Sequence, residues 1–193
     1  MKEGLDLELQ QGKRKAAKPM MWISMVSMTM MFAGLTSAYV ISSSREDWVS
    51  FDLPQAFVIS SVCIVLSSFT FFIAKQFLKK DDQKLTRLFL MATLFLGLAF
   101  VYEQYQGFLQ LKQMGLYFTG PNSEVSSSML MVIVFAHVLH VAAGVVCLLV
   151  VVLKQFLNRY NSKDMLGFEL AAIFWHFVDL LWIGLFLFFY FNT

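Results

Sequence analysis

Six histidine, aspartate and glutamate side chains interrupt otherwise apolar stretches of this chain of 193 residues, and they are its candidates for chemistry. They are Glu103, His137, His140, Glu169, His176 and Asp179. Imidazole and carboxylate groups can bind a metal ion, hold a haem iron or relay a proton. The pairs 137/140 and 176/179 are each spaced i, i+3, which places both members of a pair on one face of a helix.

Four uses of these side chains fit their spacing. A haem with two histidine ligands needs them on opposite sides of the ring, so His137 and His140 cannot serve one haem alone, although His176 could partner either. A non-haem metal could use His137, His140, His176 and Asp179, and a chain of such groups could carry protons. We favour the fourth use, in which hydrogen bonds between buried side chains hold helices in register.

Five long apolar stretches must position these residues, and they cover about residues 20–42, 54–78, 86–111, 127–153 and 168–191. Each reaches the roughly 20 residues that span a hydrocarbon core. Hydrophobic residues make up 58% of the chain and charged residues 15%, which excludes a soluble domain of ordinary composition. The prediction is an all-α fold, an integral membrane bundle of five transmembrane helices over residues 19–193, preceded by a mobile, cytosolic N-terminal tail of residues 1–18.

Basic residues alternate around these stretches and predict the orientation of the chain. Of its 15 lysines and arginines, only Arg45 and Lys112 lie in the first and third connections; the others lie in the N-terminal tail and in the second and fourth connections. Because cytosolic segments carry the excess of positive charge, we expect the N-terminus in the cytosol and the C-terminus on the periplasmic or external side. A basic cluster beside a membrane pairs with anionic lipid, so no nucleic-acid partner is predicted.

Depth along the helices predicts which polar side chains meet. At ~1.5 Å per residue, His137 of the fourth span lies level with Asp179 of the fifth, and His140 lies level with His176. We therefore predict a polar seam between the last two helices, with Glu169 at its cytosolic end.

Glu103 lies on a separate face of the third span. With Gln106, Gly107 and Gln110 it forms a polar stripe at helical spacing, which suits contact with another helix or a lipid headgroup. Cys63 and Cys147 are each alone in an apolar stretch, without the spacing of a disulfide or a thiolate metal site. We expect the chain itself to bind no haem, copper or zinc.

Three stretches of sequence resemble one known family. The run from Glu169 to Trp182, which contains Trp-His-Phe-Val-Asp, resembles the last helix of subunit III of the haem-copper terminal oxidases, the cytochrome c and quinol oxidases. The run Phe135-Ala-His-Val-Leu-His-Val-Ala-Ala-Gly144 is similar to the helix before it, and the third span is similar through Leu96-Gly97, Phe100 and Gln104. The length is that of the short, five-helix bacterial form. Gly107 stands where the family has a Glu, and Glu103 lies one turn earlier on the same face.

This resemblance implies a subunit without redox chemistry in a complex that reduces oxygen and pumps protons. Haem and copper are then expected in the partner subunits I and II, and the complex is expected in a bacterial inner (plasma) membrane, where it could join a respiratory supercomplex. The six ionisable residues would shape a site for phospholipid or helix packing, and none would be catalytic.

Two other classes of function remain open from the residues alone. One is a small proton- or ion-coupled transporter that uses Glu103 and the predicted seam, and the other is a membrane assembly factor. A transporter of this kind is expected to have a broken helix at its binding site. No proline lies inside any of the five apolar stretches.

Overall fold

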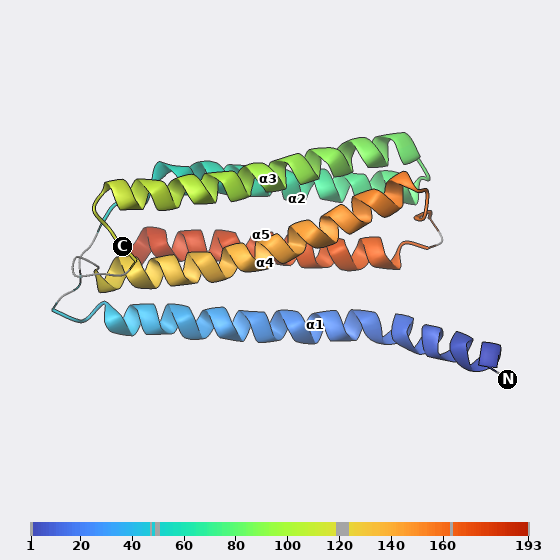
Figure 1. Ribbon diagram of the computed structural model, residues 1–193, viewed down its shortest axis with the longest axis horizontal. Helices are drawn as coiled ribbons and strands as arrows, with labels where there is room; N and C mark the ends of the chain where they lie inside the picture. The colour runs from blue at the N-terminus through green and yellow to red at the C-terminus, as the bar shows by residue number, and fades with distance from the viewer. Residues whose placement is uncertain (1, 47, 49–50, 119–123, 163, 193) are drawn as a thin grey trace.

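The computed structural model describes residues 2–46, 48, 51–118, 124–162 and 164–192, with side chains from residue 11 onward. It contains five helices: α1 (Lys2–Ser42), α2 (Gln55–Lys79), α3 (Gln83–Gln113), α4 (Val125–Phe156) and α5 (Leu166–Asn192). All five are long and apolar enough to cross a membrane. The predicted bundle of five transmembrane helices is thereby confirmed (Figure 1).

The N-terminal segment differs from the prediction. The sequence predicts a first span of about residues 20–42, whereas α1 begins at Lys2 and continues without a break through Pro19 into that span. The segment is rich in Leu, Glu, Gln, Lys and Ala, which are strong helix formers, so it extends the helix beyond the apolar span.

Helices α4 and α5 form the centre of the bundle. The antiparallel pair α2 and α3 lies on one side of them, and α1 lies on the other (Figure 1). Among the described residues α1 packs only against α4 and α5, whereas α5 contacts α1, α2 and α4. The last helix, which carries the Trp-His-Phe-Val-Asp run, therefore meets most of the other elements.

A heptad pattern joins α2 to α3. Its buried positions alternate in steps of three and four residues, at 57, 60, 64, 67, 71, 74 and 78 in α2 and at 86, 90, 93, 97, 100, 104, 107 and 111 in α3. This is the spacing of a left-handed coiled coil. Many of these positions hold small or polar residues, which let two membrane helices approach closely and form hydrogen bonds. Gln104 donates from Nε2 to Ser60 Oγ at 3.0 Å, and Ser67 donates to the Thr93 carbonyl at 3.3 Å.

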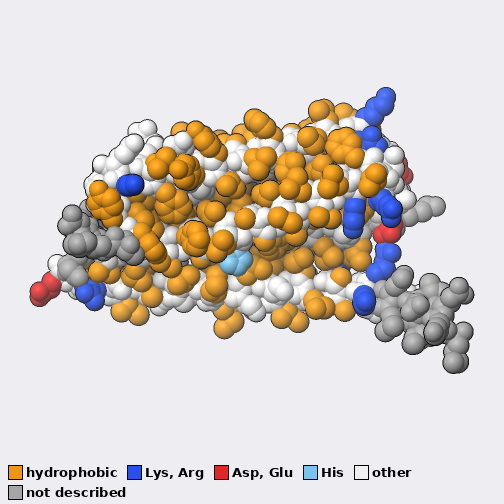
Figure 2. Space-filling model, in the orientation of Figure 1, with side chains coloured by type: hydrophobic (Ala, Val, Ile, Leu, Met, Phe, Trp, Pro, Cys, Tyr) orange, Lys and Arg blue, Asp and Glu red, His pale blue; other side chains and the backbone are white. Residues whose placement is uncertain are grey.

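Two connections meet at the end of the molecule where the lysines and arginines gather (Figure 2). Asp81 accepts hydrogen bonds from the backbone N–H and the hydroxyl of Ser162, at 2.8 and 2.6 Å. Arg87 donates to Asn158 at 2.6 Å, and Gln155 donates to Gln83. These contacts join residues 81–87, around the start of α3, to residues 155–162, around the end of α4. They therefore align the α2–α3 connection with the α4–α5 connection.

Candidate functional site: the buried face of the last helix

Two tryptophans of α5 donate hydrogen bonds to two serines of α2. Trp175 Nε1 lies 3.0 Å from Ser67 Oγ, and Trp182 Nε1 lies 2.9 Å from Ser61 Oγ. Both pairs are buried, so each bond satisfies an indole N–H in a region without water. The sequence also indicates this contact between α5 and α2, because serine pairs at 60/61 and 67/68 repeat at heptad spacing on one face of the second span.

Trp175 also depends on two glycines. A Cβ atom added at Gly97 of α3 would lie 2.7 Å from the indole ring, and one added at Gly144 of α4 would lie 3.3 Å from it. The ring therefore fills a space that these two residues leave open. In this way Trp175 connects α5 to α2, α3 and α4 at one level of the bundle.

His137 lies among aromatic rings rather than polar groups. It is fully buried, and its ring centroid is 5.1 Å from that of Trp182, 6.1 Å from that of Phe100 and 6.2 Å from that of Phe32. Neither ring nitrogen has a hydrogen-bond partner in the described part of the chain. His137 thus packs where α1, α3, α4 and α5 converge.

The other two histidines bond elsewhere. His140 Nδ1 lies 2.7 Å from the Ala136 carbonyl of its own helix, and its ring packs against Phe32 of α1. His176 Nδ1 lies 2.5 Å from Ser68 Oγ of α2. Asp179 is buried beside an open recess between α2 and α5 that His176 and Ser68 also line.

The predicted seam between α4 and α5 is therefore wrong in its pairing. His137 meets Trp182 rather than Asp179, and His176 meets Ser68 rather than His140. Trp175 lies between α2, α3 and α4, and His176, about 100° further around α5, lies on the side that faces α2. The depth estimate placed residues along the helix axis but did not give the rotation of α5, which directs its His and Asp toward α2.

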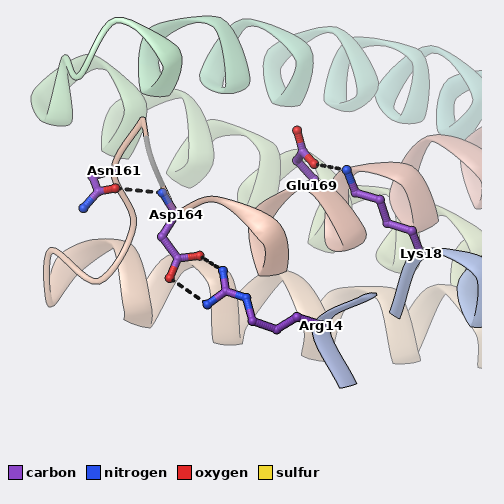
Figure 3. A network of polar contacts seen from close by, with 5 residues as sticks. All are labelled: Arg14, Lys18, Asn161, Asp164 and Glu169. Carbon is purple, nitrogen blue, oxygen red and sulfur yellow. Dashed lines mark hydrogen bonds and ion pairs between the residues drawn. The ribbon is translucent and has the colours of Figure 1, made fainter. Parts of the chain in front are cut away.

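Glu169 lies at the basic end of the bundle and pairs with α1 (Figure 3). Its carboxylate is 2.7 Å from Lys18 Nζ. One turn earlier along α1, Arg14 makes two contacts with Asp164, at 2.5 and 3.3 Å, while the Asp164 backbone N–H donates to Asn161 Oδ1 at 2.8 Å. These ion pairs fix the charged extension of α1 against the start of α5.

Tyr160 packs against the start of α5, where its ring contacts Phe168. Burial and the negative charge of Asp164 both raise the pKa of its phenol above the usual value. The phenol is consequently neutral at pH 7. Its hydroxyl lies 2.6 Å from the position that a Cβ atom would take at Gly167, so a larger residue at 167 would have to displace it.

One member of the predicted polar stripe of α3, Gln110, forms a hydrogen bond with another helix. Gln110 Oε1 accepts from the Ala56 backbone N–H of α2 at 3.3 Å, whereas Gln106 bonds to Tyr102 on its own helix at 2.8 Å. Glu103 is half-buried. The buried polar side chain of this region is that of Gln104, which lies outside the predicted stripe and bonds to Ser60.

Gly107 packs directly against Phe57 of α2. The ring occupies the space that a Cβ atom would need, so no larger side chain fits at 107 while Phe57 keeps this position. Phe57 in turn packs edge-on against Trp182, with ring centroids 5.8 Å apart. At position 107, where the family resemblance predicts a glutamate, the structure therefore has a glycine that packs against the Phe57 ring.

Within the described residues, no three His, Cys, Asp or Glu side chains come close enough together to hold a metal ion. Cys63 and Cys147 are free thiols. The arrangement of buried Trp, Ser, Gly and His side chains suits packing between helices.

Known proteins match this chain over most of its length. The family model described as cytochrome c oxidase subunit III matches residues 10–193. Cytochrome c oxidase subunit 3 of Thermostichus vulcanus is 29% identical over 179 residues, which cover 89% of this chain and 85% of that protein. A probable quinol oxidase subunit 3 of Staphylococcus aureus (strain USA300) is 29% identical over 141 residues, which cover 70% of this chain and 66% of that protein. Together with the five apolar helices, the match over residues 10–193 shows that this multi-pass membrane protein belongs to the cytochrome c oxidase subunit III family.

Proposed function

We propose that this chain is a non-catalytic subunit that stabilises the catalytic subunit of a terminal oxidase and binds phospholipid. The observation that carries the first part is the use of its polar side chains. Serines of α2 accept hydrogen bonds from the indole N–H groups of Trp175 and Trp182 and from Nε2 of Gln104. His137 is surrounded by aromatic rings. Side chains engaged in this way hold helices together and are not exposed to a reacting molecule.

Phospholipid binding is supported by a groove between α1 and α5. It has a volume of about 380 Å³ and is lined by Thr29, Phe32, Thr36, Leu181, Gly184 and Phe188, among others. An acyl chain fits such an apolar channel. The lysines and arginines at one end of the bundle suit an anionic headgroup (Figure 2).

The proposed partners are oxidase subunits I and II, which would carry the haem and copper, in a bacterial inner membrane and in some cells a larger respiratory supercomplex. The proposed orientation places the N-terminus and the α2–α3 and α4–α5 connections in the cytosol. Relatives named for cytochrome c oxidase and for quinol oxidase both match, so the proposal covers a complex fed by either donor.

Purification of the tagged chain from its native membrane tests the proposal. We expect haem absorbance and oxygen-reducing activity to co-purify with the tag in mild detergent, and not with an equally tagged, unrelated five-helix protein. Recovery of the chain without haem would contradict the proposal and would favour the transporter or assembly-factor hypothesis.

Loss of the chain tests the stabilising role. Complexes stripped of it should begin oxygen reduction at a near-normal rate and then lose activity faster during turnover. A complex that is inactive from the first turnover, although its haem spectrum is intact, would instead assign a direct chemical role to this chain.

A further inference from the structure

We infer that the recess between α2 and α5 receives a hydrogen-bond donor side chain from a transmembrane helix of another oxidase subunit. The inference rests on the proposed function, because it requires a partner subunit. The recess has a volume of about 540 Å³. Its main lining residues are Ser68, Phe69 and Phe72 of α2 and His176, Asp179 and Leu180 of α5.

Asp179 supplies the unsatisfied hydrogen-bond acceptor in this recess. Asp179 is only 4% exposed and lines the recess, and neither carboxylate oxygen meets full hydrogen-bond geometry with a described residue, although the Ser68 hydroxyl lies close to the carboxylate. The nearest hydroxyl, that of Ser68, carries a single hydrogen and already lies 2.5 Å from His176 Nδ1. Ser68 could therefore serve at most one acceptor, which leaves at least one oxygen of Asp179 unpaired.

The depth of the recess limits what can supply the missing donor. Asp179 is the middle residue of α5 (Leu166–Asn192), about 20 Å from either helix end at ~1.5 Å per residue. The headgroups of a bilayer begin roughly 15 Å from its centre, so a headgroup or interfacial water is too distant. An acyl chain reaches this depth but has no donor. A polar side chain on a neighbouring transmembrane helix meets both requirements.

The rim of the recess suits such a helix. Phe69, Phe72 and Leu180 surround the polar floor, and their side chains are 63%, 51% and 72% exposed. Exposed apolar side chains around one buried polar group resemble the anatomy of an interface anchor, in which apolar contacts exclude competing groups from a central hydrogen bond. The floor and rim together favour a helix that presents Ser, Thr, Asn, Gln, Tyr or Trp at mid-membrane depth.

Photocross-linking in the intact complex tests this assignment. The photoreactive residue p-benzoylphenylalanine replaces Phe72 at the rim or, as a matched control, Phe95 on the outer face of α3, where the side chain is 73% exposed. We expect the probe at 72 to cross-link to another oxidase subunit and the probe at 95 to cross-link to lipid. Cross-links from 72 to lipid alone would overturn the inference.

Substitution of Asp179 tests the hydrogen bond itself. Asp179→Asn keeps an acceptor oxygen and should retain the chain in the complex, whereas Asp179→Leu should weaken association by about three- to tenfold, the effect of one hydrogen bond between membrane helices. Ser24→Ala, at an exposed position of α1 where the hydroxyl bonds to the Met20 carbonyl of the same helix, is the control for loss of a polar group elsewhere. Retention is measured as the ratio of this chain to haem after detergent challenge.

The outcomes separate the inference from the proposed function. If the wild-type chain carries no haem, the proposed function fails. If haem co-purifies but Asp179→Leu is retained as well as Asp179→Asn, the inference alone is overturned. Should Asp179→Leu fail to fold, the cross-linking result at 72 still decides the matter, because it uses an Asp179 that is unchanged.

Discussion

At the scale of single residues, Trp175 shows how small and large side chains depend on one another. Its indole ring lies against Gly97 and Gly144 and donates to Ser67, so three neighbouring helices are shaped around it. The two glycines differ in clearance. A new Cβ atom would meet the ring at 2.7 Å from position 97 and at 3.3 Å from position 144.

We therefore expect Gly97→Ala to destabilise the protein more than Gly144→Ala. Overpacking of a filled core typically costs ~1–3 kcal/mol, and the closer approach at 97 forces the ring to move. Thermal inactivation of the purified complex, or loss of this chain on heating in detergent, measures the difference. Equal stability of the two variants would contradict the predicted order.

A second prediction concerns the hydrogen bond from Trp182. Ser61→Ala removes the acceptor that lies 2.9 Å from the indole N–H and leaves that group buried without a partner. An unsatisfied buried group typically costs ~1–3 kcal/mol. Ser43→Ala is the control, because Ser43 is exposed and its hydroxyl bonds only to the nearby Val40 carbonyl. Trp fluorescence during denaturation should report earlier loss of the Ser61→Ala fold.

At the scale of elements, α1 is attached differently from the rest. Helices α2 and α3 share a heptad interface along their length, whereas α4 and α5 are the only other helices that α1 contacts within the described chain. Its deepest contacts are aromatic. Phe32 packs against His137 and His140, and Tyr39 packs against Phe188 and Phe189.

Phe32→Ala should loosen α1 selectively. The change removes a buried ring from the interface between α1 and α4. Loss of a buried ring from a protein core typically costs ~3–5 kcal/mol. We expect faster hydrogen–deuterium exchange in α1 and little change in α2 and α3. Met30→Ala, at a side chain that is 71% exposed, provides the control. Uniformly faster exchange in all five helices would contradict the separate attachment of α1.

At the scale of the whole molecule, the chain carries most of its lysines and arginines at one end of the bundle (Figure 2). The ion pairs Arg14–Asp164 and Lys18–Glu169 lie at that end, where they hold α1 to α5 (Figure 3). Positive charge resists translocation, so this end should face the cytosol.

Cysteine labelling in intact cells tests the orientation. In a background with Cys63→Ala and Cys147→Ala, an impermeant thiol reagent should label Asn192→Cys from outside and should leave Lys80→Cys unlabelled until the cells are permeabilised. Permeabilisation should expose both positions, which controls for reactivity. Labelling of Lys80→Cys alone in intact cells would reverse the proposed topology.

The five spans and the charge asymmetry could be predicted from the sequence because both depend on local properties. A run of about 20 apolar residues must satisfy its backbone hydrogen bonds internally and so becomes a helix, whatever its neighbours. The Trp-His-Phe-Val-Asp run likewise pointed to the correct family before any contact was known. The helical extension over residues 2–18 depends on helix propensity and not on the apolar pattern, which begins only near residue 20.

Only the tertiary structure decided which side of each helix meets which neighbour. A helix can rotate about its axis without changing its span or depth, so the level of His137 and Asp179 did not determine whether they touch. The rotation of α5 depends on several helices at once: Gly97 and Gly144 leave room for Trp175, and Ser61 and Ser67 accept from the two indoles. These contacts turn His176 and Asp179 toward α2, because an α-helix holds its side chains at fixed angles to one another.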